Sequence, residues 1–188
     1  MRAFLALEIS PATRTALGEV IRRLRPHTLR VKWVDPPQVH LTLVFFGDLP
    51  PEKLEGVKAA AARACAASAP FDFRVLGLGS FGQGGRMRVL WCGLDEPTGA
   101  LAALHGALQA ALEPLGFEPE RRPFSPHLTL GRLREPSREE PLRRALEEMA
   151  GFEAGMDRAE SLILFESTLT PRGPVYTVRG QWALGGAP

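Results

Sequence analysis

The sequence has 188 residues, of which 45% are apolar and 23% are charged, a composition that excludes a disordered, collagen-like or fibrous chain. This length suits one domain, or two small lobes that share a core, and should bury about 70% of the surface that the unfolded chain exposes. The 23 basic and 21 acidic residues leave a net charge of +2, which excludes binding through overall charge but allows a local basic patch.

Two features of the sequence predict a reducing compartment and no membrane anchor. Cys65 and Cys92 have no partner at zinc-ligand spacing and form no disulfide framework, so we interpret them as small buried apolar side chains. Glu8 interrupts the apolar N-terminal stretch before it reaches the length of a signal peptide, and no run approaches the roughly 18 apolar residues of a membrane span. We therefore expect a cytoplasmic protein.

In the first half of the chain, apolar β-branched runs alternate with helical stripes. They predict, in chain order, a strand over 2–9, a helix over 12–24, a strand over 39–46, a helix over 51–67 and a strand over 71–76. Ser10 is a suitable N-cap for the first helix, and Pro11 suits its first turn.

The second half predicts a similar series of elements. A strand over 86–93 is followed by a helix over 98–115, a strand over 127–133 and a helix that ends near Met149, with two or three further strands between 152 and 184. Ser137 and Glu140 have the spacing of a capping box, so we expect them to open the last helix.

These two series indicate an internal repeat. The tetrapeptide His-Leu-Thr-Leu occurs at residues 40–43 and again at 127–130, an offset of 87 residues, and each copy lies in the second predicted strand of its half. No stretch of linker composition separates the halves. We therefore predict a single bilobal domain over 1–188, with halves of about 1–87 and 88–188.

The repeated tetrapeptide combines two residue types that suit phosphate chemistry. Side chains alternate between the faces of a strand, so His40 and Thr42 share one face, as do His127 and Thr129, while the leucines face the other way. If the halves pack about a pseudo-two-fold axis, the two polar pairs face each other across a groove. One imidazole can then accept a proton from an attacking group while the other gives a proton to the leaving oxygen. The threonine hydroxyls can hydrogen-bond the phosphoryl oxygens.

The paired motifs resemble those of the 2H phosphoesterase superfamily, which is named for its two His-x-Thr motifs. Their context in this chain, VHLTLVFFGDL and FSPHLTLGRL, is similar to that of the bacterial and archaeal RNA 2′,3′-cyclic phosphodiesterases, also called 2′-5′ RNA ligases. The resemblance covers essentially the whole chain. It implies an α+β fold of two pseudo-two-fold-related lobes, each a small, largely antiparallel sheet with outer helices, flanking a central cleft.

The resemblance also implies an activity. His40 falls on the family's proton donor and His127 on its proton acceptor, and the family uses neither a metal nor an organic cofactor. Its members hydrolyse a 2′,3′-cyclic phosphate to a 2′-phosphate, with the 3′ oxygen leaving, and some join RNA ends through a 2′-5′ linkage in the reverse direction. For this chain we expect RNA ends or cyclic nucleotides as partners, no metal, no membrane, and a monomeric state.

Further residues are candidates for contacts with the substrate. The family often has an arginine phosphate clamp just past the second motif, which falls on Arg132. Strand alternation places Arg132 on the wrong face unless Gly131 introduces a bulge. Several aromatic rings are candidates for stacking on a base, with core packing as the alternative: Trp33, Phe45, Phe46, Phe124 and Tyr176. A basic rim or a solvated surface are the two interpretations of the cations before each motif: Arg22, Arg23, Arg25, Arg30, Lys32, Arg121 and Arg122. His27 and His105 are not repeated, and we interpret both as structural.

Three other functions fit parts of the sequence. The same fold could act on a small cyclic nucleotide such as ADP-ribose cyclic phosphate, because the motifs address the phosphate and nothing else. The chain could also be a non-catalytic RNA-end-binding module in which the His-Thr pairs merely hydrogen-bond phosphate. A metal-dependent phosphodiesterase is disfavoured, because neither motif histidine has a carboxylate or a second histidine at ligand spacing.

Overall fold

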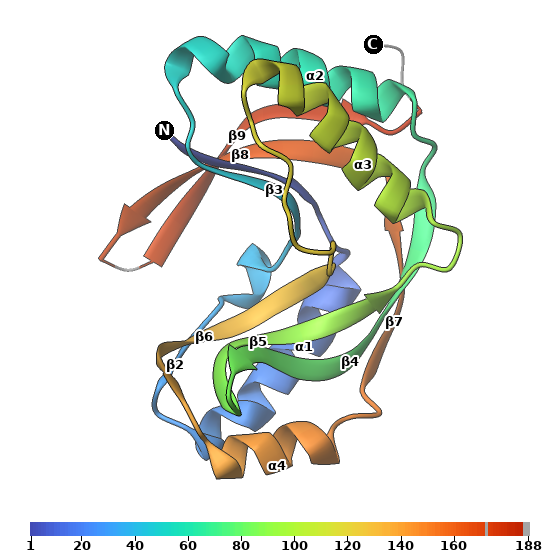
Figure 1. Ribbon diagram of the computed structural model, residues 1–188. Coiled ribbons are helices and arrows are strands. Elements are labelled where there is room, and N and C mark those ends of the chain that lie inside the picture. Colours follow the sequence, from blue (N-terminus) through green and yellow to red (C-terminus); the bar gives the residue numbers. More distant parts are fainter. Residues whose placement is uncertain (172, 186–188) are drawn as a thin grey trace.

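The computed structural model describes residues 1–171 and 173–185, and within them nine strands and four α-helices follow one another along the chain (Figure 1). The strands are β1 (Arg2–Leu7), β2 (Val31–Trp33), β3 (Leu41–Asp48), β4 (Phe71–Gln83), β5 (Arg86–Asp95), β6 (His127–Ser137), β7 (Glu153–Ala159), β8 (Ser161–Thr170) and β9 (Gly173–Ala183). The helices are α1 (Pro11–Leu24), α2 (Leu54–Ala66), α3 (Ala100–Leu112) and α4 (Glu140–Glu148). None of these helices is both long and apolar enough to span a membrane.

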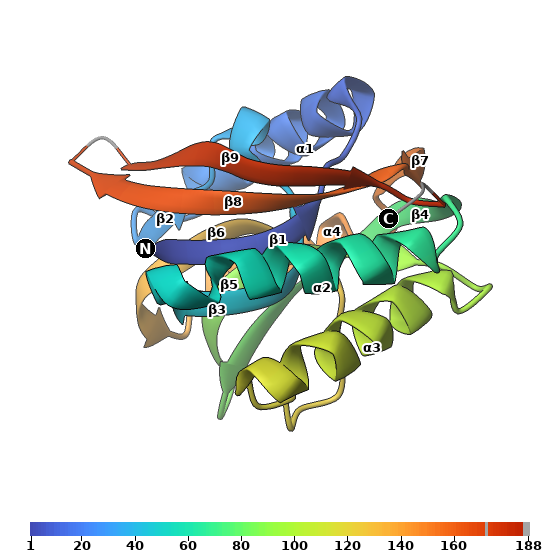
Figure 2. The same cartoon turned by 90° about the horizontal axis from the view of Figure 1, so that it is seen from above.

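The strands form one antiparallel sheet that divides into two lobes. Their order is β7-β4-β5-β6-β3-β1-β8-β9, with β2 paired to β6 outside this path. The two central strands, β3 and β6, share a single registered pair, Leu41 with Leu128. On one side of this pair, β3, β1, β8 and β9 are covered by α2 and α3, and we call this the upper lobe. On the other side, β2 and β4–β7 are covered by α1 and α4, and we call this the lower lobe (Figures 1 and 2). The predicted α+β fold with two antiparallel lobes and outer helices is confirmed.

The lobes do not follow the order of the sequence. Each half of the chain gives one long helix to each lobe: α1 and α2 come from the first half, α3 and α4 from the second. The last two strands, β8 and β9, return to the upper lobe, where β8 pairs with β1 along Ala3–Leu7. The two halves are therefore interlocked, and each lobe contains segments of both.

A continuous main core lies between the sheet and its outer helices. A second cluster lies on the opposite face of the sheet, which we call the inner face. Both leucines of each motif belong to the main core, and Leu41 and Leu128 are fully buried. The second cluster consists of Phe4, Ala6, Ile163 and Phe165, with Tyr176 packed against it. The sheet of the upper lobe thus carries apolar side chains on both faces, so a side chain on its inner face packs against an apolar surface.

The polar signals at helix starts gave one correct and one wrong prediction. Ser10 caps α1 as predicted, because its Oγ accepts a hydrogen bond from the Thr13 amide at 3.2 Å. The capping box predicted for α4 is wrong. Ser137 is the last residue of β6, its hydroxyl donates to Glu139 Oε1 at 3.0 Å, and Glu139 precedes the helix without a side-chain cap. The longer strand β6 moves Ser137 out of the capping position.

Candidate active site

The leucine pair that joins β3 to β6 brings the two motifs together. In an antiparallel pair, the positions next to it are His40 opposite Thr129 and Thr42 opposite His127. All four side chains are partly exposed and lie on the face opposite the buried leucines. The register therefore gathers both His-Thr pairs into one polar cluster on the inner face, at the junction of the lobes.

Each motif histidine is held by its own chain in the same way. Nδ1 of His40 lies 2.7 Å from the backbone carbonyl of Gln38, and Nδ1 of His127 lies 2.8 Å from that of Ser125. Because a carbonyl can only accept a hydrogen bond, each Nδ1 carries a proton. Each Nε2 is then the ring nitrogen that can exchange a proton with a ligand. The repeat thus extends from the tetrapeptide to a carbonyl two residues before it.

The His40 ring is enclosed by aromatic side chains of the upper lobe. It stacks on Phe4 with ring centroids 4.6 Å apart and an interplanar angle of 19°, and meets the edge of Tyr176 at 5.4 Å. Phe165 lies 6.3 Å away. This burial lowers the pKa of His40, and the hydrogen bond to the Gln38 carbonyl opposes the effect without reversing it. The imidazolium form of His40 is therefore a stronger acid than an ordinary histidine.

The His127 ring has a different neighbourhood in the lower lobe. It meets the ring of Phe81 edge to face, with centroids 4.8 Å apart. Phe81 in turn lies against Trp91, which is the cross-strand partner of Thr129. A Cβ atom on Gly79 would clash with the Trp91 ring, so this position must be glycine for the indole to lie flat on β4. The tryptophan and phenylalanine together support the second motif from the side.

A bulge in each motif strand reorients the residue three positions after the threonine. Against their neighbours, β3 has an extra residue at Leu43 and β6 has one at Leu130. On β6, Leu130 and Gly131 are both buried, and Arg132 then faces outward on the polar side of the motif. The bulge that would bring Arg132 into the site is therefore present next to Gly131. With the offset of 87 residues, the equivalent position on β3 is Phe45, which is 55% exposed.

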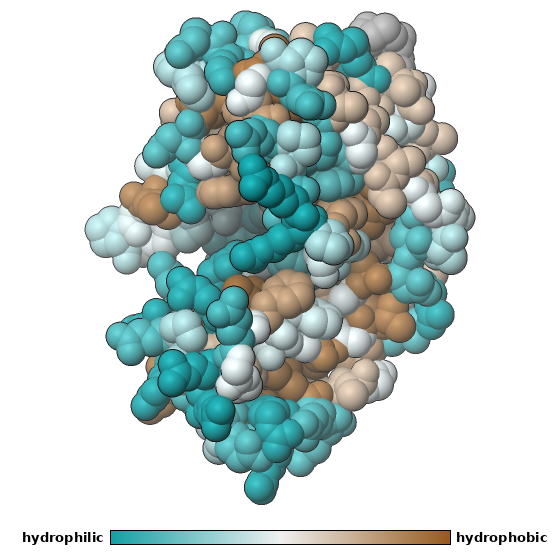
Figure 3. Space-filling view, viewed as in Figure 1, coloured by the Kyte–Doolittle hydropathy of each residue, from teal (hydrophilic) through white to brown (hydrophobic). Residues whose placement is uncertain are grey.

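A hollow of about 350 Å³ opens beside His40. Its walls include Gln38 and Tyr176, together with Arg14 and Glu8, whose side chains form an ion pair at 3.2 Å. Figure 3 views the molecule from the opposite side, where α2 and α3 lie, and shows a notch between the two lobes at the left that is bordered by hydrophilic side chains. A larger hollow of about 590 Å³, between the start of β4 and the start of α3, contains none of the motif residues.

The other aromatic candidates divide into two groups. Tyr176 contacts His40, and Phe45 lies beneath the Arg2 guanidinium, whose Cζ is 4.9 Å from the ring centroid. The remaining three pack internally: Phe46 on Phe117, Trp33 beside Gly131, and Phe124 on His105 at 3.9 Å. Only the first two rings therefore lie near the motifs on the inner face, and the His105 stack fixes the loop that leads into β6.

The cations of the predicted basic rim are not equivalent. Arg22, Arg30 and Arg121 are engaged in ion pairs, with Glu19, Glu139 and Glu118 respectively. Lys32 differs, because β2 pairs with β6 and makes Lys32 the direct cross-strand partner of Arg132. Lys32 is therefore the member of this group that the sheet places next to the site.

The side chains that bind metals in proteins are dispersed in this chain. Across residues 1–171 and 173–185, no three His, Cys, Asp or Glu side chains are grouped so as to hold a metal ion. Cys65 and Cys92 are buried free thiols, and burial raises the pKa of Cys65 to about 11 and that of Cys92 to about 12. Both cysteines are therefore unreactive core residues, as predicted.

Sequence reasoning missed the residues that support the histidines. Phe4 lies in a strand that is apolar on both faces, so it looked like an ordinary core residue. Phe81 lies among the glycines at positions 77, 79 and 82 of β4, and Trp91 on β5 is the cross-strand partner of Gly79. The available signal was this glycine-rich strand. The Gln38 and Ser125 carbonyls are backbone atoms, which side-chain patterns do not reveal.

The sequence is similar to that of known proteins along most of its length. Residues 12–162 match the family model of the 2′-5′ RNA ligase superfamily. The chain is 37% identical over 191 residues to an RNA 2′,3′-cyclic phosphodiesterase of Thermus thermophilus, covering 99% of this chain and 91% of that protein. It is 33% identical over 177 residues to the protein of the same name from Methanothermobacter thermautotrophicus, covering 94% and 95% of the two chains.

Solved structures resemble the whole fold. The crystal structure of TT0787 of Thermus thermophilus superposes with a TM-score of 0.83 at 32% identity, covering 99% of both chains. The crystal structure of E. coli LigT complexed with 3′-AMP superposes with a TM-score of 0.73 at 24% identity, covering 97% of both chains. The likeness to the second structure shows that the bilobal fold is shared.

Proposed function

Because the chain belongs to the 2′-5′ RNA ligase superfamily, we propose that it is a phosphodiesterase that hydrolyses 2′,3′-cyclic phosphate ends of RNA to 2′-phosphates. One observation carries the proposal: both motif histidines lie at the junction of the lobes with Nδ1 bound to a carbonyl and Nε2 left for proton transfer. The relatives named RNA 2′,3′-cyclic phosphodiesterase support the choice of substrate class.

In the proposed reaction, His127 acts as the proton acceptor and His40 as the proton donor. Nε2 of His127 removes a proton from water as the water oxygen attacks phosphorus. The bond from phosphorus to the 3′ oxygen breaks, and Nε2–H of His40 protonates that oxygen. The product is a 2′-phosphate with a free 3′ hydroxyl, and the two histidines have exchanged protonation states. The same sequence with a 5′ hydroxyl in place of water would join a 2′,3′-cyclic phosphate end to that hydroxyl through a 2′-5′ linkage.

The surroundings of His40 support its role as the donor. Its burial makes the imidazolium a stronger acid, which favours proton transfer to the leaving alkoxide. A bound phosphate anion raises the pKa of a neighbouring histidine and so restores the protonated form when substrate is present. An apolar pocket suits such a donor, because His40 becomes positively charged only when the negative charge of the substrate phosphate lies beside it and compensates that charge.

The remaining site residues are proposed to bind the phosphoryl group. Thr42 and Thr129 stand beside the histidines on the same face, where their hydroxyls can donate to oxygens whose charge grows in the transition state. Arg132 lies on this face because of the β6 bulge, and its planar fork suits a phosphate oxygen pair. Since the equivalent residue of β3 is Phe45, the clamp would act from the lower lobe.

Turnover of adenosine 2′,3′-cyclic phosphate in excess chelator, followed by phosphorus NMR, tests the proposal. We expect conversion to the 2′-phosphate, and loss of turnover in both His40→Ala and His127→Ala. Formation of the 3′-phosphate, or loss of activity in chelator, would contradict it. Binding without turnover would identify a binding module, and turnover of ADP-ribose cyclic phosphate in preference to RNA ends would identify a small-nucleotide enzyme.

A further inference from the structure

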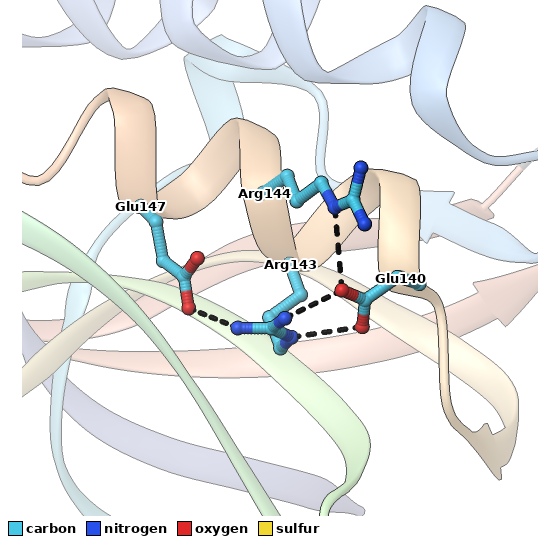
Figure 4. Close-up of polar contacts among 4 residues, drawn as sticks. All are labelled: Glu140, Arg143, Arg144 and Glu147. Carbon is cyan, nitrogen blue, oxygen red and sulfur yellow. Dashed lines mark hydrogen bonds and ion pairs between the residues drawn. The ribbon is translucent and has the colours of Figure 1, made fainter.

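Many arginines of this protein are neutralised by carboxylates. On α4, Arg143 and Arg144 share Glu140, and Arg143 also reaches Glu147 (Figure 4). Ion pairs of the same kind engage seven further arginines: Arg14, Arg22, Arg30, Arg74, Arg121, Arg158 and Arg179. In the part of the chain that the structure describes, four cations near the motifs have no carboxylate oxygen within 4.0 Å: Arg2, Lys32, Arg88 and Arg132. We call these four residues the inner cations.

The sheet places three of the inner cations in a row across adjacent strands. Lys32 of β2 is the cross-strand partner of Arg132 on β6. On the other side of Arg132, β5 pairs through Val89, and Arg88 directly precedes Val89 as an extra residue in the pairing of β5 with β4. Neighbouring strands are about 4.8 Å apart. Lys32 therefore lies directly beside Arg132 on one side, and on the other side Arg88 lies next to the partner of Arg132.

The positions of neighbouring residues show on which face of the sheet this row lies. A Cβ atom on Gly131 would meet Val31 at 2.5 Å and Trp33 at 3.1 Å, and these two side chains pack against the main core. Lys32 lies between them on β2 and is exposed, so it points away from the core, as Arg132 does. Arg88 is likewise exposed, whereas Met87 next to it belongs to the main core, so Arg88 also points away from the core. The three cations therefore lie on the same inner face as the two motifs.

The fourth inner cation reaches the same region from the upper lobe. Arg2 follows the alternation of β1, so it shares the inner face with Phe4, and its guanidinium covers Phe45. Burial lowers the pKa of Arg132, and the positive charges of Arg88 and Arg2 lower it further. Arg132 and Arg2 also act on Tyr176, where they oppose the rise in its pKa that burial causes. Arg2 of the upper lobe and the three cations of the lower lobe thus lie around one region of the inner face.

Grouping like charges without a counter-ion is unfavourable, and cross-strand pairs of like charge are destabilising. An anion larger than the single phosphate held by the two motifs would neutralise this group. We propose that Arg88, Lys32 and Arg2 form a second phosphate subsite next to Arg132, which takes the internucleotide phosphate that precedes the terminal nucleotide of an RNA strand. This inference rests on the proposed function, and it makes oligonucleotides better substrates than mononucleotides.

Three substrates that differ in their second phosphate test the subsite. They are adenosine 2′,3′-cyclic phosphate, the same nucleotide with a 5′-phosphate, and the dinucleotide ApA that ends in a 2′,3′-cyclic phosphate. We expect kcat/KM of the dinucleotide to exceed that of the unmodified mononucleotide by about 10- to 100-fold, the range for a hydrogen-bonded charged contact. In Arg88→Gln this advantage should fall to about threefold or less while activity on the mononucleotide is retained.

Arg63→Gln is the matched control. Arg63 is exposed on α2, so this substitution removes the same charge from the outer surface. Arg88→Gln should also reduce the slope of log affinity against log salt for the dinucleotide by about 0.7, the value for one phosphate contact on a single strand. Lys32→Gln should have an effect in the same direction, and it repeats the test if Arg88→Gln folds poorly. An unchanged dinucleotide advantage in both variants would overturn the proposal.

The outcomes separate this inference from the proposed function. If the protein turns over all three substrates equally, the phosphodiesterase stands and the subsite is refuted. If the 5′-phosphate gives the advantage and the dinucleotide does not, the subsite binds a mononucleotide phosphate and the assignment to RNA is wrong. If nothing is turned over, calorimetry with ApA 2′-phosphate and adenosine 2′-phosphate still decides, because tighter binding of the dinucleotide that Arg88→Gln abolishes would support the subsite.

Discussion

The two His-Leu-Thr-Leu segments have the same local geometry and different surroundings. Each histidine donates Nδ1–H to the carbonyl two residues earlier, and each strand bulges at the second leucine of its motif. Around His40, however, the upper lobe packs three aromatic rings, whereas one ring meets His127. Past the bulges, the first strand presents Phe45 and the second presents Arg132.

This difference shows how two copies of one tetrapeptide can place the same side chains in unlike surroundings. The tetrapeptide and its bulge determine where the imidazole and the hydroxyl point, and these features are local. The acidity of the imidazole depends on which rings the neighbouring strands place against it, and those strands come from distant parts of the sequence. Substitutions at equivalent positions in the two motifs therefore test which properties are shared and which are not.

Replacing either histidine by alanine should have the largest effect. General acid and general base catalysis each contribute about 10²- to 10⁴-fold in rate, so His40→Ala and His127→Ala should each lower kcat by that range. The loss in the double variant should be smaller than the product of the two single losses, because the groups act in one step. Single-turnover rates on adenosine 2′,3′-cyclic phosphate measure this. Full additivity would mean that the histidines act independently.

Removing the hydroxyls should have a smaller and more even effect. Thr42→Val and Thr129→Val keep the shape of the side chain and remove a donor worth about 1.5–3 kcal/mol when it binds a charged group. We expect kcat/KM to fall by about 10- to 100-fold in each variant, with melting temperatures close to that of the wild type. Wild-type activity in both valine variants would show that the threonines only pack.

Much of this site could be predicted from the sequence, because its main features are local. Strand alternation correctly places His40 and Thr42 opposite the buried leucines, and the glycine at 131 correctly suggests a bulge before Arg132. The interlocking of the halves was not predictable, because nothing local shows that β8 returns to β1. For the same reason, the sequence did not reveal Phe165 and Tyr176 as neighbours of His40.

The close packing of β6 against β2 can be tested by filling the space that Gly131 leaves. In Gly131→Ala, the new Cβ would lie 2.5 Å from Val31 Cγ1 and 3.3 Å from the Lys32 carbonyl oxygen, so the Val31 side chain or strand β2 would have to move. Overpacking of this kind costs about 1–3 kcal/mol, so the melting temperature should fall by several degrees. Gly106→Ala in α3 is the control, because nothing lies within 4 Å of its Cβ position, and it should be neutral or stabilising. Equal stability of the two variants would contradict the close packing at Gly131.

The smallest expected effect concerns stability at acid pH. The folded protein lowers the pKa of His40, so the unfolded chain binds a proton there more readily. Its contribution to stability is therefore complete above the unfolded value of about 6.5 and is lost as the pH falls below it. Melting temperatures between about pH 5 and 8 should decline toward acid less steeply in His40→Gln than in the wild type. A steeper decline in the variant would mean that folding raises this pKa.

A substrate with an activated leaving group tests the central claim, that the two histidines of matched geometry have opposite roles. A nitrophenyl phosphodiester releases a stabilised phenolate, which needs no proton, whereas the attacking water still needs its base. The account predicts that this substrate restores much of the activity lost in His40→Ala and little of that lost in His127→Ala. If the activated substrate restored the activity of His127→Ala and not that of His40→Ala, the two roles would be reversed. Equal losses of activity in both variants on this substrate would contradict the division of roles.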